Sequence, residues 1–515
     1  MIDRVRQVGL LLGPLAFAAV CLLPTPEGLT DPGQRTAGVA GWMAIWWISE
    51  AVPIYVTALL PIALFPLLGI LKAGNLASAY GHHFIYMFMG GFMLARTIER
   101  WNLHERIALH IVRIIGVSPS RLILGMMLAT AFLSMWISNT ASTLIMLPIG
   151  MAILMEAALI AGTTVEEHPE LSTMATCLML AVAYAANIGG MGTLVGTAPN
   201  VVFVSQLSTL FPAAPEVTFT DWMRMAMPLV IVFIPLVWLY LTRVAFPIRM
   251  RELPGGSRVI RERLAALPPM TTPEWRVAAV FALTAFGWLF RKPIDLGFAT
   301  LPGWADLAGV GGWVNDATVA IAAALLLFVI PSGAGNDKSG LDGRLLDWKT
   351  AATIPWGVLI LFGGGLALAK GVDTTGLSGW IGSLFNGLAG MPLVILLVTL
   401  CLVMVFLTEV TSNTAVSTLF MPILGAAAVT LGQNPVLLML PAVLCASCAF
   451  MLPVATPPNA IVFGSGYIRI PQMARAGLVL NLIATMLVTG LVYLSIMPGF
   501  DIQADEVPLW AQEGG

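Results

Sequence analysis

The sequence predicts an all-α protein that crosses a membrane many times and is built from two related halves. Of its 515 residues, 58% are hydrophobic and 10% are charged, and the mean hydropathy is +0.89. So little polar surface cannot cover a soluble core of this size, and we therefore expect the chain in a bilayer. The two halves are indicated by the strings Ser138-Asn139-Thr140 and Ser412-Asn413-Thr414, which interrupt apolar stretches 274 residues apart.

Apolar stretches of about 17 to 25 residues, the length of a membrane-spanning helix, predict the spans. We expect eleven, at residues 8–24, 36–50, 53–71, 84–115, 171–210, 226–246, 274–290, 314–331, 354–385, 434–466 and 473–497. The first run follows two arginines as a signal peptide does, but the apolar segments after it indicate a retained span. Two further segments, 120–155 and 390–430, carry a Ser-Asn-Thr string at mid-length. Each is predicted to form a re-entrant hairpin with the string at its tip, because irregular backbone at membrane depth must face protein or a watery cavity.

The repeat extends beyond these strings. Residues 90–96 align with 364–370, and Pro148 aligns with Pro422, both at the same offset of 274. An odd number of crossings separates equivalent elements, so the two copies are expected to be inverted relative to each other. The basic loop at 242–266 and an acidic tail after Met497 place the N-terminus in the cytoplasm and the C-terminus outside.

The two tips are suited to bind an anion. A hairpin tip exposes backbone N–H groups at the start of its second helix, where the helix dipole is positive. Ser, Asn and Thr cap such helix ends and add side-chain donors. Two tips that converge from opposite membrane faces therefore predict an anion pocket.

Each half also carries a polar string that contains proline, Thr197-Ala198-Pro199-Asn200 in the first and Thr456-Pro457-Pro458-Asn459 in the second. Proline breaks the spanning helix and frees carbonyls near Gly196 and Ala455. Ser134 and Thr408 add hydroxyl oxygens one turn before the tips. Uncharged oxygen ligands suit a monovalent cation such as sodium better than Mg²⁺ or Ca²⁺. Broken helices at matching positions of two halves predict a secondary transporter.

Other function classes receive less support. A net charge of −2 offers no basic field for nucleic acid, and the five cysteines lie mostly in apolar runs, as helix-packing residues do. No HExxH motif, paired intramembrane aspartates or Ser/His pairing indicates an enzyme, and a channel would need a continuous polar lining. Ser, Thr and Asn also serve as glue between membrane helices, an explanation that fits one string better than four in register. Glu409 is an acid at membrane depth whose first-half equivalent is Met135, and we expect it to support the site structurally or electrostatically rather than to couple ions or protons directly.

The four strings resemble the paired signatures of the divalent anion:sodium symporters, the INDY-like dicarboxylate carriers. Residues 46–53 and 57–61 also resemble the early region of that family, and the similarity runs from about residue 40 to 497. The sequence departs from the family pattern at Ala198, where a second proline is common, and this leaves the geometry of the first break open.

The resemblance implies an elevator-type homodimer with its site between the strings. Scaffold helices and interfacial arms would occupy 1–119 and 226–389, and the hairpins and broken helices of the transport domain would occupy 120–225 and 390–515. Substrate contacts would come from the two tips and the two proline strings, at Ser138, Asn139, Thr140, Thr197, Ser412, Asn413, Thr414, Thr456 and Pro457. Sodium would bind at Ser134, Ser138, Asn139 and Gly196, and at Thr408, Thr411, Asn413 and Ala455.

The leading hypothesis is sodium-driven uptake of a C4 dicarboxylate such as succinate, malate or fumarate across a bacterial inner membrane, with no organic cofactor. The alternatives are a sodium-independent dicarboxylate exchanger and a sulfate or citrate carrier of the same fold. An intramembrane enzyme is the alternative outside transport.

Overall fold

The computed structural model describes residues 2–116, 118–295, 299–333, 343–388 and 390–512. Helices dominate these ranges, as predicted, and one short antiparallel ribbon joins β1 (Ile294–Asp295) to β2 (Thr300–Leu301). The helices up to residue 210 are α1 (Ile2–Leu22), α2 (Asp31–Ser49), α3 (Ile54–Thr57), α4 (Leu60–Leu67), α5 (Ala73–Tyr80), α6 (His83–Arg100), α7 (Leu103–Ile115), α8 (Pro119–Ser134), α9 (Asn139–Ile160), α10 (Pro169–Gly190) and α11 (Ala198–Leu210).

The remaining helices follow the loop after α11. They are α12 (Phe219–Leu239), the π-helical η1 (Tyr240–Ala245), α13 (Gly256–Ala266), α14 (Thr272–Leu289), α15 (Trp304–Leu307), α16 (Asp316–Val329), α17 (Trp348–Ala351), α18 (Trp356–Thr374), α19 (Leu377–Ser383), the 3₁₀ turn η2 (Asn386–Leu388), α20 (Leu393–Leu407), α21 (Asn413–Thr430), α22 (Pro435–Ala446), α23 (Pro457–Phe463), α24 (Ile470–Leu491), the π-helical η3 (Val492–Ile496), α25 (Met497–Gly499) and α26 (Leu509–Gln512).

Seven helices in the described ranges are long and apolar enough to cross a membrane. They begin at Arg4, Asn139, Pro169, Phe219, Trp356, Asn413 and Ile470, and five shorter apolar helices accompany them. The predicted span 53–71 is divided between α3 and α4, and the spans 171–210 and 434–466 are each divided at their proline strings. The protein is therefore a multi-span helical membrane protein, as the composition indicates.

Two predicted spans are shorter than expected because one residue ends each helix. The span 84–115 is α6 followed by the separate amphipathic helix α7, and the span 354–385 is α18 followed by α19. Asn102 (φ 54°) and Gly376 (φ 70°) take left-handed backbone conformations at these junctions. They lie 274 residues apart, so the same break ends the same helix in both halves. The charged stretch 96–106 is likewise divided between α6 and α7.

Glycines let the repeat-related helices α6 and α18 pack closely against their neighbours. A Cβ at Gly90 would lie under 3.0 Å from the backbone of Ala320 in α16, and a Cβ at Gly364 under 3.0 Å from the backbone of Ala58. Backbone cannot move aside as a side chain can, so a larger residue would push the helices apart. The alignment of 90–96 with 364–370 therefore marks equivalent helix crossings.

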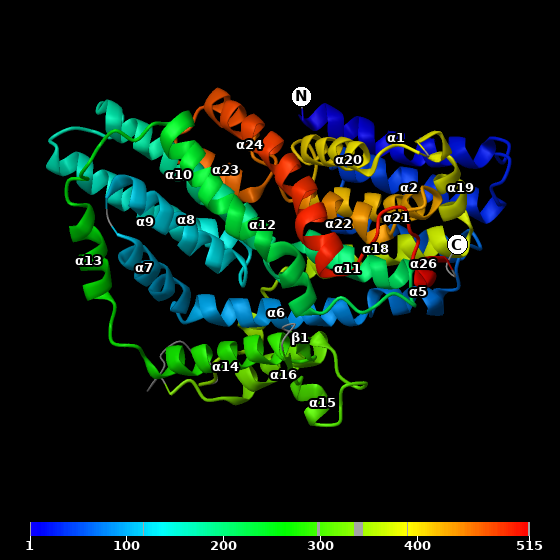
Figure 1. The fold of residues 1–515 in the computed structure, drawn as a ribbon, viewed down its shortest axis with the longest axis horizontal. Helices are drawn as coiled ribbons and strands as arrows, with labels where there is room; N and C mark the ends of the chain where they lie inside the picture. The colour runs from blue at the N-terminus through cyan, green and yellow to red at the C-terminus, as the bar shows by residue number, and fades with distance from the viewer. Residues whose placement is uncertain (1, 117, 296–298, 334–342, 389, 513–515) are drawn as a thin grey trace.

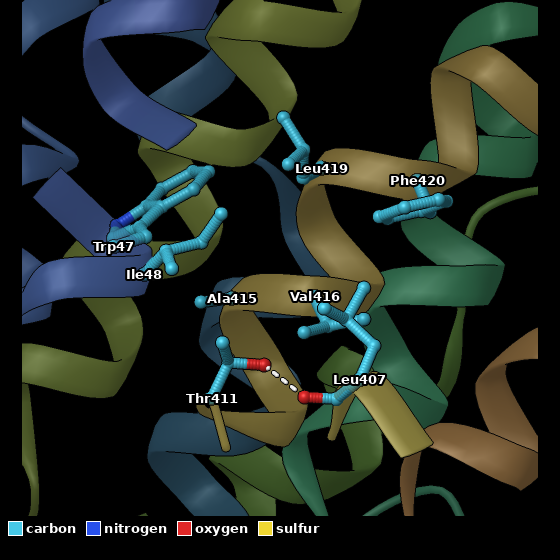
Figure 2. A pocket seen from close by; sticks show the side chains of 8 residues that line it. All are labelled: Trp47, Ile48, Leu407, Thr411, Ala415, Val416, Leu419 and Phe420. Atoms are coloured by element: carbon cyan, nitrogen blue, oxygen red, sulfur yellow. Dashed lines mark hydrogen bonds between the residues drawn. The ribbon is translucent and has the colours of Figure 1, made fainter. Parts of the chain in front are cut away.

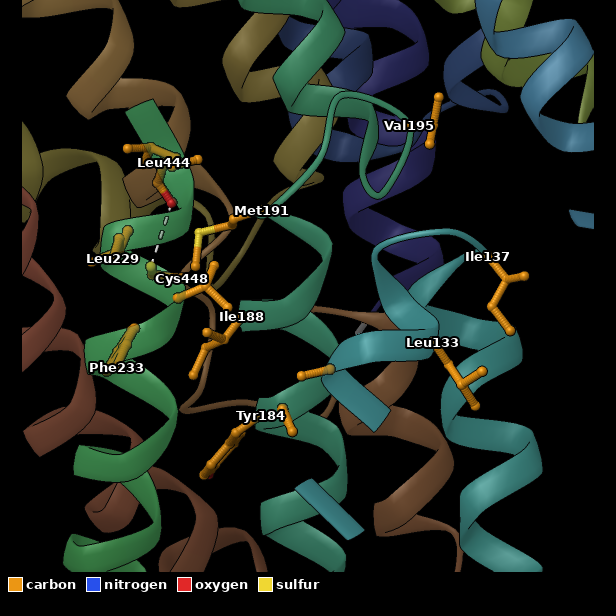
Figure 3. Packing of buried hydrophobic residues seen from close by; sticks show 14 of the residues in the cluster. Leu133, Ile137, Tyr184, Ile188, Met191, Val195, Leu229, Phe233, Leu444 and Cys448 are labelled. Atoms are coloured by element: carbon orange, nitrogen blue, oxygen red, sulfur yellow. Dashed lines mark hydrogen bonds between the residues drawn. The ribbon is translucent and has the colours of Figure 1, made fainter. Parts of the chain in front are cut away.

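The helix α10 lies at the centre of the larger hydrophobic cluster. Every residue from Met174 to Gly190 is buried, and Figure 3 shows Tyr184, Ile188 and Met191 packed among side chains of neighbouring helices. In Figure 1, α10 lies beside α12, while α14 and α16 lie beyond α6. A second, smaller cluster is formed chiefly by α2 to α5 with α18 and α19. Any polar group on α10 must therefore find its partner inside the protein.

Candidate functional site

Each Ser-Asn-Thr string lies in the turn between two consecutive helices, α8 and α9 in the first half and α20 and α21 in the second. Ser138 is the N-cap of α9 and accepts a hydrogen bond from the Ala141 backbone N–H at 3.2 Å. Ser412 is the N-cap of α21 and accepts from the Ala415 N–H at 3.5 Å. Asn139 and Asn413 are the first residues of these helices. The strings thus occupy the positive helix ends at which the sequence predicted them.

A cluster of three oxygens lies behind each tip. Ser134 Oγ lies 2.5 Å from Asn139 Oδ1 and 2.7 Å from the Ala186 carbonyl oxygen. The second half repeats this arrangement with Thr408, Asn413 and Ala446. Thr408 Oγ1 lies 2.6 Å from Asn413 Oδ1 and 2.7 Å from the Ala446 carbonyl oxygen.

These clusters are short of protons. A hydroxyl carries one hydrogen and can donate it to only one acceptor at a time. With the Asn139 and Asn413 amides turned so that Oδ1 faces the hydroxyl, the orientation that a bound cation favours, one pair of oxygens in each cluster faces each other without a hydrogen between them. Ser134 and Thr408 are fully buried, and Asn139 and Asn413 are half-buried. A small cation would satisfy these oxygens, and the donor set fits sodium.

The helix breaks are held by a pair of asparagines. Asn200 Nδ2 donates to the carbonyls of Gly190 (2.9 Å) and Thr193 (2.6 Å). Asn459 Nδ2 donates to the carbonyls of Ala449 (3.1 Å) and Leu452 (3.0 Å), which lie 259 residues after Gly190 and Thr193. The asparagine that ends each proline string therefore fastens the unwound backbone, a role that residue type alone did not distinguish from ligand contact.

The two predicted threonines cap the helices after the breaks. Thr197 is the N-cap of α11 with no side-chain cap bond, and it is half-buried. Thr456 is the N-cap of α23, buried, and accepts from the Asn459 N–H at 3.3 Å. Gly196 and Ala455, which precede these threonines, are buried, whereas Pro457 is exposed. The Thr197 hydroxyl is thus the freer of the two.

Asn187 joins the two halves, and sequence reasoning missed it. Its Nδ2 lies 3.3 Å from the Ala449 carbonyl oxygen and 3.2 Å from Thr456 Oγ1. The carbonyl of Ala186, the residue before Asn187, accepts the hydrogen bond from the Ser134 hydroxyl. The carbonyl of Ala446, three residues before Ala449, accepts the one from the Thr408 hydroxyl. Asn187 therefore joins the backbone next to the first oxygen cluster to the helix break beside the second. The only sequence signal for Asn187 is one amide in a long apolar helix, with no repeat partner of the same type.

Apolar walls flank the two tips. Trp136, in the first hairpin turn, packs edge-on against Phe281 of α14 with ring centroids 4.8 Å apart. Beside the second tip, Trp47 and Ile48 of α2 line a pocket with Thr411, as Figure 2 shows. The Thr411 hydroxyl donates to the Leu407 carbonyl at 2.7 Å across the turn that follows α20. A donating hydroxyl keeps its oxygen lone pairs, so both this oxygen and the Thr411 backbone carbonyl remain for the predicted cation.

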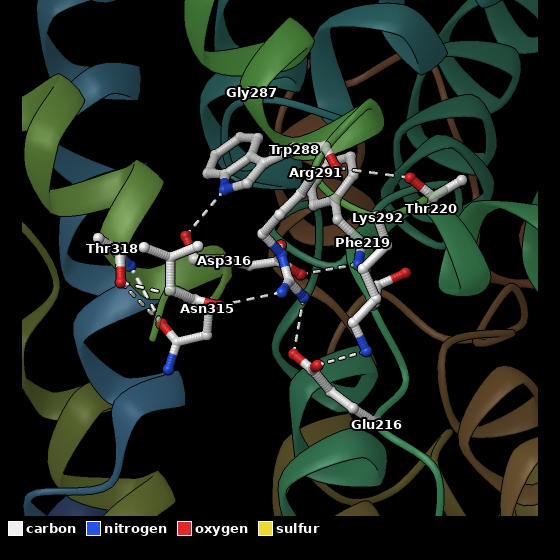
Figure 4. A network of polar contacts seen from close by, with 12 residues as sticks. Glu216, Phe219, Thr220, Gly287, Trp288, Arg291, Lys292, Asn315, Asp316 and Thr318 are labelled. Carbon is white, nitrogen blue, oxygen red and sulfur yellow. Dashed lines mark hydrogen bonds and ion pairs between the residues drawn. The ribbon is translucent and has the colours of Figure 1, made fainter. Parts of the chain in front are cut away.

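A separate ionic network ties the loop before α12 to α14 and α16 (Figure 4). Arg291 is buried and donates to Asp316 Oδ1 at 2.6 Å and to Glu216 Oε1 at 2.7 Å, and Lys292 reaches Glu216 Oε2 at 2.7 Å. The Phe219 N–H also donates to Asp316 Oδ2 at 2.8 Å. Burial alone would raise the pKa of Glu216, but hydrogen bonding and charge from Lys292 and Arg291 outweigh it and lower that pKa.

Known proteins share this sequence and fold. Residues 5–497 match the family described as the sodium:sulfate symporter transmembrane region. A protein of Staphylococcus saprophyticus named sodium-dependent dicarboxylate transporter SdcS is 44% identical over 501 residues, which cover 96% of this chain and 93% of that one. The SdcS protein of Staphylococcus aureus is also 44% identical, with the same coverage.

A solved structure, the Alcanivorax borkumensis YdaH transporter, matches with a TM-score of 0.55 over 97% of this chain and 98% of that one. Its sequence identity is 14%, so this likeness concerns the fold alone. The family match extends through both hairpins and both breaks and confirms the resemblance that the four strings indicated. The chain therefore belongs to the sodium:sulfate symporter family of membrane transporters.

Proposed function

We propose that this protein is a secondary transporter that couples inward sodium flux to uptake of a C4 dicarboxylate such as succinate. The observation that carries the proposal is the pair of proton-deficient oxygen clusters behind two capped helix ends, at Ser134 and Thr408. Relatives named sodium-dependent dicarboxylate transporters, 44% identical over nearly the whole chain, support the choice of ion and substrate.

The substrate would be held by neutral donors at the two tips. The half-buried or exposed residues Ser138, Thr140, Ser412 and Thr414 offer hydroxyls beside the free N–H groups that begin α9 and α21. Two tips match the two carboxylates of a dicarboxylate. Asn139 and Asn413 carry the amide groups between each tip and the cluster behind it, and Thr197 and Thr456 would add hydroxyls from the breaks.

Sodium would bind in the clusters as the second transported species. The first site comprises Ser134, Ser138, Asn139 and Gly196, and the second Thr408, Thr411, Asn413 and Ala455. No arginine or lysine lies in any of the four strings, so a substrate with two negative charges depends on the cations beside it. Binding of both species is therefore cooperative, and this cooperativity couples the sodium gradient to uptake.

The movement would follow the elevator scheme. Residues 120–225 and 390–515 would move as a transport domain against a scaffold of 1–119 and 226–389, with α7 and α19 as connecting arms. The N-terminus would lie in the cytoplasm and the C-terminus outside a bacterial inner membrane, in a homodimer. In the same proposal, the chain crosses the membrane eleven times, carries two re-entrant hairpins and is built from two inverted repeats.

The test is uptake of radiolabelled succinate into proteoliposomes with and without an inward sodium gradient. We expect accumulation that requires sodium. Uptake that ignores sodium but requires internal dicarboxylate would indicate an exchanger instead. Competition by unlabelled sulfate or citrate, stronger than by malate or fumarate, would contradict the substrate assignment.

A further inference from the structure

Glu409 is a buried acid beside the second cluster whose carboxylate is fully engaged. It follows Thr408 in the turn between α20 and α21. Its Oε1 accepts from the backbone N–H groups of Phe450 (2.7 Å) and Met451 (2.9 Å), and Oε2 accepts from the Leu452 N–H at 3.1 Å. Asn481 Nδ2 donates to Oε1 at 2.8 Å. A carboxyl group that accepts four N–H donors and donates none is in its ionised form.

These bonds hold the second helix break from within. Phe450, Met451 and Leu452 lie in the unwound segment between α22 and α23. The carbonyls at the edges of this triplet, those of Ala449 and Leu452, are the two that Asn459 fastens. The segment then leads to Ala455, which is placed in the second sodium site. One carboxylate thus connects the hairpin turn to the backbone that would present sodium ligands.

The first half closes its break without a charge. At the position equivalent to Glu409 stands Met135, whose terminal methyl group would lie 3.0 Å from a Cβ built at Gly192. Two of the three corresponding N–H groups donate to backbone, that of Met191 to the Ile188 carbonyl at 3.2 Å and that of Gly192 to the Gly189 carbonyl at 2.9 Å. The two oxygen clusters therefore match, but only the second has an ionised group next to it.

We propose that Glu409 is a positioning residue that gives the second cation site a higher sodium affinity than the first. This proposal takes the identity of the ion, sodium, from the proposed function. The carboxylate acts in two ways, by fixing the break that carries Ala455 and by placing a negative charge near Thr408 and Asn413 in a region of low dielectric constant. It contacts backbone and Asn481, and not the substrate.

The test compares Glu409→Gln with wild type and with Met135→Leu, a volume-conserving change at the repeat-related position. Two curves are measured for each purified variant: the thermal unfolding midpoint against sodium concentration in choline-balanced buffer without substrate, and sodium-dependent succinate uptake in proteoliposomes. The unfolding midpoint rises with the logarithm of sodium concentration and yields a fitted sodium dissociation constant. We expect Glu409→Gln to raise this dissociation constant and the half-saturating sodium concentration of uptake about tenfold, the change expected from losing hydrogen bonds to a charged group. Uptake at saturating sodium should persist, and Met135→Leu should leave the half-saturating concentration unchanged.

A purely structural role predicts a different result. Glu409→Gln would then lower the unfolding midpoint in choline and leave the half-saturating sodium concentration as in wild type, and this outcome overturns the proposal. If Glu409→Gln does not fold, Glu409→Asp keeps the charge but is one methylene too short to reach all its partners. A raised half-saturating concentration in Glu409→Asp supports the proposal, and an unchanged one overturns it. The substrate-free sodium titration stands even if succinate is not transported, so failure of the proposed function is recognised separately.

Discussion

The change Gly190→Ala tests the first cation cluster with a single methyl group. Gly190 ends α10 directly behind Asn139, and a Cβ at this position would lie under 3.0 Å from Asn139 Oδ1. The obstructing group is the end of a side chain, so the fold accommodates the methyl when the amide rotates away. That rotation breaks the 2.5 Å contact with Ser134, at a cost of about 1 kcal/mol of stability.

The sodium dependence of transport should change more than stability, because the displaced Asn139 Oδ1 is a predicted sodium ligand. Loss of one charge-assisted contact of about 1.5 to 3 kcal/mol raises the half-saturating sodium concentration by about ten- to a hundredfold. The assay is sodium-dependent succinate uptake in proteoliposomes beside the thermal unfolding midpoint of the purified protein.

Two further glycines serve as controls. Gly490→Ala, with nothing within 4 Å of its Cβ, should match wild type in both measurements. Gly189→Ala meets the backbone of Ala131, which cannot rotate away, and should lower stability by about 1–3 kcal/mol. Wild-type sodium dependence in Gly190→Ala would refute the placement of Asn139 in the cation site.

Three other changes address the second tip, the link between halves and the ionic network. Asn413→Ala should abolish succinate uptake and leave the elution profile and unfolding midpoint near wild type; full activity would refute the site assignment. Asn187→Leu should reduce uptake and lower stability by about 1–3 kcal/mol, because its partners Ala449 and Thr456 stay buried without a donor. Glu216→Gln should lower stability by about 1 kcal/mol, since Glu216 is about one-third exposed. The folded pKa of Glu216 is lowered because Lys292 and Arg291 together outweigh burial, so this contribution is present above the ordinary value of 4.5 and is lost as pH falls through the folded pKa. Unfolding midpoints of wild type and variant from pH 8 to pH 3 should therefore converge only below about pH 4.5.

Much of the fold followed from sequence because composition and local chemistry agreed with it. Ser138 and Ser412 cap their helices as residue type and apolar context predicted. The proline strings break α10 from α11 and α22 from α23. The ends of α6 and α18 were missed, since hydropathy continues across Asn102 and Gly376 and does not report a left-handed backbone.

The supporting shell of the site was harder to predict. The strings named the groups at the tips, but Asn187 and Asn481 are isolated amides in apolar helices without a counterpart in the other half. Their partners are carbonyl and carboxylate groups that approach only after the chain has folded. Asn200 and Asn459 end the proline strings, but their hold on the breaks could not be predicted, because it depends on which carbonyls the unwound backbone leaves free.

The difference between the two breaks has a cause in their side chains. The first break carries glycines at 189, 190 and 192, and the positions 259 residues later hold Cys448, Ala449 and Met451. Without side chains, the first segment can turn tightly enough for Gly192 to bond to the Gly189 carbonyl. The second segment is bulkier, and three successive N–H groups turn instead to the carboxylate of Glu409. A charged acceptor at this depth thus compensates for the lost glycines, and the two otherwise matched oxygen clusters, which are the proposed cation sites, are not electrostatically equivalent.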